Sequence, residues 1–183
     1  MIRFATRDDF SRFTKEIGDA DRTALRKRAE DRSPNGTTFL SHSSRDQELV
    51  VGAIRVLEGH GATVYIDKKD SSLPPYTNEQ TAQTLKDRIN QSRKFVLLAS
   101  ENSNQSKWVP WELGLADGYK GIGKVAIFPN VQSNENTAWT SWEYLGLYDR
   151  IVWGDLEGES DRVWMVYNKK SHTACKLNVW LSR

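Results

Sequence analysis

The segment Ser106–Gly118, SKWVPWELGLADG, sets two tryptophans beside a single glutamate at the start of a helix-forming run. Trp108 and Glu112 are four residues apart, so both side chains project from one face of a helix that begins near Trp108. Pro110 suits the first turn of such a helix, where its missing N–H costs no hydrogen bond. An aromatic ring beside a carboxylate predicts a pocket for a flat, charged ligand.

The same residues also have a structural interpretation. In that interpretation, Trp108 and Trp111 anchor the helix in a hydrophobic core, and Glu112 simply favours the positive end of the helix dipole. Residue types in this one segment leave both interpretations open, so the elements around it must decide.

Length and composition describe one globular domain. The chain has 183 residues, of which 38% are hydrophobic and 27% are charged. Its longest apolar runs, such as residues 95–99, are far shorter than a membrane span, so we expect no contact with a membrane. The N-terminal sequence MIRFATRDDFSRF carries charges where an export signal needs an apolar stretch. We therefore expect a cytoplasmic protein.

Several classes of function are disfavoured by composition. The single cysteine, Cys175, excludes an intrachain disulfide and a cysteine-rich zinc site. The three histidines are scattered without metal-binding spacing, so we predict neither a metal nor another cofactor. A net charge of +2 is too small to indicate nucleic acid as a partner.

The N-terminal residues differ in pattern from the rest. Residues 8–31 place a few apolar side chains at helical spacing among many charges, which predicts one or two surface helices. The sequence RSPNG at residues 32–36 then indicates a turn or linker. We predict an N-terminal helical extension over residues 1–35 and the main domain over residues 36–183.

From residue 37 onward, short apolar strands alternate with helices. The expected strands are TTFL (37–40), ATVYID (62–67), KFVLLAS (94–100) and KVAIFPN (124–130). Helical patterns lie between them, at residues 47–61, 80–92 and 109–121. This order predicts a doubly wound parallel α/β sheet, in which ligands bind at the carboxyl ends of the strands.

Three phrases at those strand ends carry a resemblance to a known family. They are FLSH at residues 39–42, VYID at 64–67 with the loop 68–76 after it, and SKWVPWEL at 106–113. In this order and on these elements, they resemble the Toll/interleukin-1 receptor (TIR) domain, especially its bacterial branch. The resemblance covers about residues 37–130 and implies a flavodoxin-like sheet of about five strands.

The resemblance also implies an activity. In enzymatic TIR domains, the glutamate at the position of Glu112 is essential for cleaving the nicotinamide–ribose bond of NAD. Ordinary glycosidases use two carboxylates, one of which protonates the leaving group. The leaving group of NAD is a pyridinium that departs as neutral nicotinamide, so one carboxylate suffices to hold the ribose and stabilise the developing oxocarbenium charge.

The resemblance assigns other residues to the substrate NAD. Trp108 offers a ring for stacking, the loop from Ser41 and the ammonium of Lys68 offer contacts to ribose or phosphate, and Tyr76 closes the loop over the site. For Lys68 a solvated charge, and for His42 a packing role, remain alternatives. The full set of predicted substrate-binding residues is Phe39, Ser41, His42, Ser43, Asp67, Lys68, Tyr76 and Trp108.

We therefore predict an NAD-cleaving enzyme of bacterial antiphage immunity. It depletes NAD or makes a cyclic ADP-ribose-type signal, and a stand-alone TIR domain favours the signal. Its expected partners are other copies of its own TIR domain and a separate effector protein that the product activates. A non-catalytic adaptor or virulence mimic, and an enzyme like nucleoside deoxyribosyltransferase, remain alternatives. A response-regulator receiver is disfavoured because no paired acidic residues follow the first strand.

Overall fold

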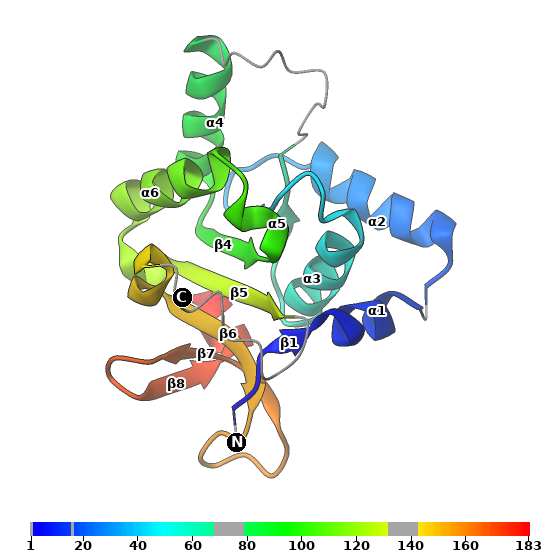
Figure 1. Cartoon of the computed structure of the whole chain (residues 1–183), viewed down its shortest axis with the longest axis vertical. Helices are drawn as coiled ribbons and strands as arrows, with labels where there is room; N and C mark the ends of the chain where they lie inside the picture. The colour runs from blue at the N-terminus through cyan, green and yellow to red at the C-terminus, as the bar shows by residue number, and fades with distance from the viewer. Residues whose placement is uncertain (1, 16, 68–78, 132–142) are drawn as a thin grey trace.

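The computed structural model describes residues 2–15, 17–67, 79–131 and 143–183. Within these ranges, eight strands form one sheet in the order β3-β2-β4-β5-β6-β7-β8, with β1 also paired to β5 (Figure 1). The strands are β1 (Ala5–Thr6), β2 (Thr38–Ser41), β3 (Val64–Tyr65), β4 (Lys94–Ala99), β5 (Val125–Val131), β6 (Asp149–Gly154), β7 (Val163–Asn168) and β8 (Thr173–Lys176). The helices are α1 (Arg7–Lys15), α2 (Asp19–Asp31), α3 (Gln47–Gly59), α4 (Glu79–Gln91), α5 (Glu101–Asn104), α6 (Trp108–Lys120) and α7 (Leu177–Ser182), with short 3₁₀ turns η1 (Ile122–Lys124) and η3 (Glu143–Leu147).

The sheet has a parallel centre and an antiparallel edge. Strands β3, β2, β4, β5 and β6 run parallel to their neighbours, whereas β7 and β8 join the sheet antiparallel. Strands and helices alternate from β2 to β5, because each parallel crossover needs a connection long enough to return along the sheet. The predicted doubly wound α/β fold is therefore confirmed, and the antiparallel strands extend it.

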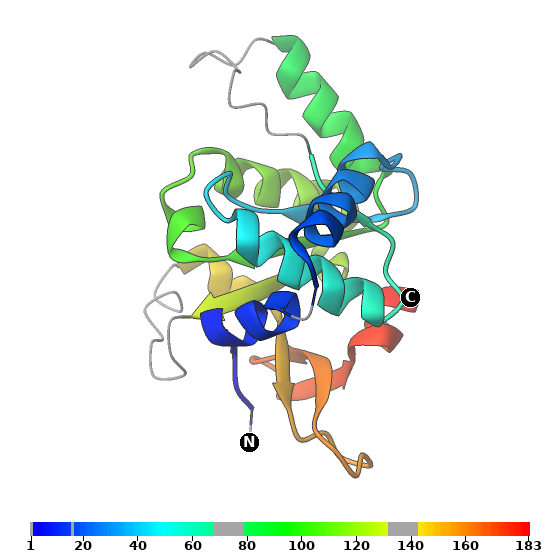
Figure 2. The ribbon, with the colours of Figure 1, turned by 90° about the vertical axis from the view of Figure 1, so that its right-hand side faces the viewer.

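Helices cover both faces of the sheet, and alternate strand residues supply each core. Ala126 and Phe128 of β5 join the core under α1, α2, α3 and α7. Val125 and Ile127 point to the opposite face and join the core under α4 and α6. Figure 2 looks onto the first of these faces, with the blue and cyan helices in front of the sheet. Among the described residues, every helix is too short or too polar to cross a bilayer.

The N-terminal residues are part of the sheet as well as helical. The predicted helices are present as α1 and α2, but Ala5 and Thr6 of β1 also pair with the end of β5. A two-residue strand has no detectable periodicity, so the sequence predicted only helices here.

Phe10 of α1 is 1% exposed, and its ring lies 5.2 Å from that of Phe128. A Cβ at Gly52 of α3 would lie 2.3 Å from the Phe10 ring, so glycine permits this close approach. The boundary at residue 35 stays a prediction.

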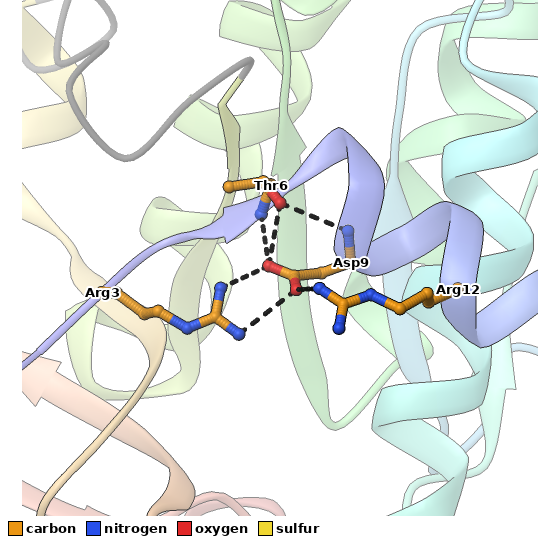
Figure 3. Close-up of polar contacts among 4 residues, drawn as sticks. All are labelled: Arg3, Thr6, Asp9 and Arg12. Carbon is orange, nitrogen blue, oxygen red and sulfur yellow. Dashed lines mark hydrogen bonds and ion pairs between the residues drawn. The ribbon is translucent and has the colours of Figure 1, made fainter.

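A buried carboxylate joins β1 to α1. Asp9 is 4% exposed and accepts hydrogen bonds from the backbone and hydroxyl of Thr6, while its own N–H donates to the Thr6 hydroxyl (Figure 3). Arg3 donates to both of its oxygens, at 2.5 and 3.2 Å, and Arg12 donates at 3.0 Å. Burial alone raises the pKa of Asp9, but the hydrogen bonds from Arg3 and Thr6 outweigh it and hold the pKa below its usual 3.8.

This network predicts that acid weakens the packing of the N-terminal segment. Because its folded-state pKa is lowered, the Asp9 carboxylate stabilises the fold above pH 3.8, and that contribution is lost as the pH falls through the folded-state value. Asp9→Asn should lower the free energy of unfolding by about 2–3 kcal/mol at pH 7 and by less at pH 3. Urea unfolding at the two pH values measures the difference.

Asp8→Asn is the matched control, because Asp8 is exposed in the same helical turn. It should change stability by less than about 0.5 kcal/mol at either pH. Equal losses for the two variants would contradict the stabilising role of Asp9.

Candidate active site

The start of α6 places the predicted carboxylate against the sheet. The helix begins at Trp108, one residue before the expected range 109–121, and Glu112 lies one turn inside it. Val109, Leu113 and Ala116 of the same helix are buried in the core beside β4 and β5. Because side chains three and four residues apart share a helix face, this packing turns Glu112 toward the strands.

Glu112 is held in the interior by a residue from a distant strand. Its side chain is 1% exposed, and the hydroxyl of Ser41, the last residue of β2, donates a hydrogen bond to its Oε2 atom. A buried carboxylate is costly unless hydrogen bonds replace its hydration. The contact therefore joins the carboxyl end of β2 to the first turns of α6, 71 residues away in sequence.

The two tryptophans at the start of α6 contact each other. Trp108 and Trp111 meet edge to face, with ring centroids 5.4 Å apart and an interplanar angle of 76°. Both are partly buried and pack against the core under α4 and α6. Trp111 thus has the packing contacts expected of it. Trp108 shares them, and its role as a ring for substrate stacking stays a prediction.

The loop after β2 is buried beside Glu112. Ser41, His42 and Ser43 are exposed by 1%, 2% and 5%. The Nδ1 atom of His42 lies 3.3 Å from the carbonyl oxygen of Leu40, so the ring interacts with its own strand. Ser41 contacts the carboxylate directly, and His42 and Ser43 follow it in the chain. Contacts of the three residues with a substrate stay predictions.

Asp46 ends the loop that begins at Ser41, and it is not among the site residues predicted from the sequence. It is 2% exposed at the start of α3 and accepts hydrogen bonds from the Ser100 hydroxyl at 2.5 Å and the Asn102 amide at 2.6 Å. Ser100 also caps α5, the short helix between β4 and α6, through a reciprocal capping box with Ser103. The serine at the end of an apolar strand, three residues before a second serine, was the signal for that cap. Asp46 fastens the loop after β2 to the loop after β4.

Two other predicted residues have partners within the fold. Phe39 is 1% exposed, and its ring lies 5.5 Å from both Tyr65 and Phe95, which places it in the core beneath the site. Asp67 accepts a hydrogen bond from the Tyr65 hydroxyl at 3.0 Å and forms an ion pair with Arg88 of α4. Burial, followed by the charge of Asp67, raises the pKa of Tyr65 above its usual value.

Lys68 and Tyr76 lie outside the described residues. In the described part of the chain, no three His, Cys, Asp or Glu side chains gather where they could hold a metal ion.

Comparison with known proteins agrees with this geometry. Residues 38–166 match the TIR domain family. The chain belongs to the TIR domain family. It is 34% identical over 148 residues to the probable 3′ cyclic ADP-D-ribose synthase ThsB′ of Bacillus cereus (strain MSX-D12). The matched region covers 79% of this chain and 75% of the relative.

A second relative is more distant. The putative cyclic ADP-D-ribose synthase TIR2 of Cytobacillus dafuensis is 28% identical over 120 residues. That match covers 56% of this TIR protein and 31% of the relative, so the chain spans less than a third of that longer protein.

The Asp46 contacts predict that the loops after β2 and β4 of this TIR domain depend on one carboxylate for their relative position. Asp46→Asn replaces one of the two acceptor oxygens by an NH2 group, so one hydrogen bond from Ser100 or Asn102 is lost. The free energy of unfolding should fall by about 1–3 kcal/mol. Chemical denaturation measures this free energy. Asp87→Asn makes the same chemical change on the exposed side of α4 and should have little effect. A similar loss in both variants would show that Asp46 has no special part in holding the loops.

Proposed function

We propose that this TIR protein cleaves the nicotinamide–ribose bond of NAD, with Glu112 as the catalytic carboxylate. The observation that carries the proposal is the burial of Glu112 at the carboxyl edge of the parallel sheet, with the Ser41 hydroxyl on its Oε2 atom. Ligands of open α/β sheets bind at this edge. Both relatives are named as cyclic ADP-D-ribose synthases, which supports a reaction on an ADP-ribosyl substrate.

One carboxylate is enough for the bond-breaking step. The C–N bond between ribose and nicotinamide breaks, its electron pair stays with the pyridinium nitrogen, and nicotinamide leaves neutral. Positive charge then develops on the ribose as an oxocarbenium ion. A carboxylate in a water-poor interior stabilises that charge more strongly than one in water. The Ser41 hydroxyl fixes the orientation of the carboxylate before the substrate arrives.

We infer that a cyclic ADP-ribose-type product follows from the same step. If water attacks the oxocarbenium carbon, linear ADP-ribose forms. If a nucleophilic group of the same molecule attacks and loses its proton, a ring forms. Exclusion of water from the reacting site favours the ring, and the names of both relatives support ring formation.

Enclosure of Glu112 also has a consequence for activation. A ribose reaches a carboxylate that is 1% exposed only after neighbouring groups have moved. TIR domains associate with one another, and we infer that contact between two copies opens and completes this site. The product then acts on a separate effector protein within bacterial antiphage immunity.

Removal of the carboxylate charge tests the proposal directly. Glu112→Gln keeps the size of the side chain and one acceptor oxygen for Ser41 but loses the negative charge. It should reduce nicotinamide release from NAD by about 10³-fold. Release is followed by chromatography over a range of protein concentrations, because association should raise the rate per molecule. Glu48→Gln, an exposed change at the start of α3, is the control and should retain activity.

The outcomes of that assay separate the alternatives. Release that survives Glu112→Gln would overturn the role of Glu112. No release from the unmodified protein at any concentration would favour a non-catalytic TIR adaptor. Transfer of a free base between nucleosides would favour an enzyme like nucleoside deoxyribosyltransferase.

The Ser41 contact makes a second prediction. Ser41→Ala removes the donor to Glu112 and leaves the carboxylate less well oriented, so kcat should fall by about ten- to a hundredfold. Because the hydroxyl is engaged with Glu112, KM for NAD should change much less. Ser44→Ala, in the exposed part of the same loop, is the matched control. A rise in KM with an unchanged kcat would instead make Ser41 a substrate-binding residue.

A further inference from the structure

Lys94 is a buried cation for which the proposed NAD chemistry has no use. It is the first residue of β4, in the middle of the parallel sheet, and is 2% exposed. Its Nζ atom lies 4.4 Å from the centroid of the Trp180 ring of α7. Among the described residues, its side-chain ammonium forms neither a hydrogen bond nor an ion pair with a carboxylate. A cation–π contact replaces only part of the hydration that an ammonium loses on burial.

A pocket lies next to this ammonium. Its volume is about 400 Å³, within the range of small-molecule sites, and its lining includes Lys94, Val166, Cys175, Trp180 and Arg183. Lys94 begins β4 and Asp149, which also lines the pocket, begins β6. The pocket is therefore at the amino end of the parallel strands, whereas Glu112 is at the carboxyl end.

Positive charge predominates around the pocket. Burial, followed by the charges of Arg93 and Lys124, lowers the pKa of Lys94 from its usual value, and Arg183 contributes in the same direction. Among the described residues that line the pocket, Asp149 is the one acidic side chain, and it accepts a hydrogen bond from Asn168 at 2.7 Å. Two cations, Lys94 and Arg183, thus line the pocket against one acidic side chain, Asp149.

Two neutral polar side chains of the lining, Asn168 and Thr173, have partners within the protein. The Asn168 amide donates to Asp149 and its carbonyl oxygen accepts from the N–H of Ser171. The Thr173 hydroxyl lies 2.7 Å from that of Ser171. Lys94 and Arg183 are the cationic groups among the described residues that line this pocket.

We propose that the pocket binds a small phosphate-bearing anion through Lys94 and Arg183. An ammonium acts as a point charge on phosphate, and a guanidinium donates to two of its oxygens at once. The volume leaves room for the organic part of a phosphate ester beside the apolar wall at Val166. The site is separate from Glu112, so its ligand is not the substrate of the proposed reaction.

Binding is tested with inorganic phosphate and ribose 5-phosphate on the whole protein. At constant ionic strength set with sodium chloride, phosphate at ten times its Kd should raise the Tm by about 3–5 °C. Lys94→Met keeps an unbranched chain against Trp180 and should weaken calorimetric affinity for both anions by at least about tenfold. Without phosphate, this variant should melt at or above the temperature of the unmodified protein, because it buries no charge. Ribose, which lacks the phosphate, should not bind.

Two further variants keep the test decisive. Arg183→Met changes an exposed residue of the lining, so it tests the site if Lys94→Met fails to fold, and should also weaken phosphate binding. Lys27→Met, on the exposed side of α2, removes a charge far from the pocket and should bind phosphate like the unmodified protein. Equal phosphate affinity in all these variants, or no phosphate-specific rise in Tm, would overturn the proposal.

Discussion

The burial of one carboxylate is the constraint on which the arrangement of this TIR domain depends. Glu112 sits in the interior at the start of α6, where water does not replace lost hydrogen bonds. The Ser41 hydroxyl meets this need from the end of β2. The strand and the helix must therefore keep their relative position, and the elements between them must hold it.

Those elements hold the position through packing on one side and polar contacts on the other. Val109 and Leu113 fix α6 to the core beneath it, and Phe39 anchors β2 in the same core one residue layer below Ser41. Above the core, Asp46 ties the loop after β2 to Ser100 after β4. Because β2 and β4 are direct neighbours in the sheet, a single carboxylate spans the two loops.

The two ends of the sheet carry opposite buried charges. At the carboxyl end, the Glu112 carboxylate accepts a hydrogen bond from the Ser41 hydroxyl. Asp9, which follows β1, pairs with the guanidinium groups of Arg3 and Arg12. At the amino end, the Lys94 ammonium rests on a tryptophan ring and faces a pocket. A buried charge without a hydrogen-bonding partner is costly, so an anion that pairs with it would recover part of that cost.

The sequence by itself determined the parallel α/β fold, the start of α6 near Trp108 and the position of Glu112 about one turn inside it. These follow from local rules, because strand runs, helix periodicity and i, i+4 spacing are written within a few residues. Only the tertiary structure decided that Ser41 holds Glu112, that Asp46 joins two loops, that β1 completes the sheet and that Lys94 meets Trp180. Each of these pairs residues far apart in the chain, and a single sequence carries no signal for which distant polar groups or short strands will meet. The physical reason is that periodicity fixes which face of an element is buried, whereas the partner on that face is fixed by how the elements pack together.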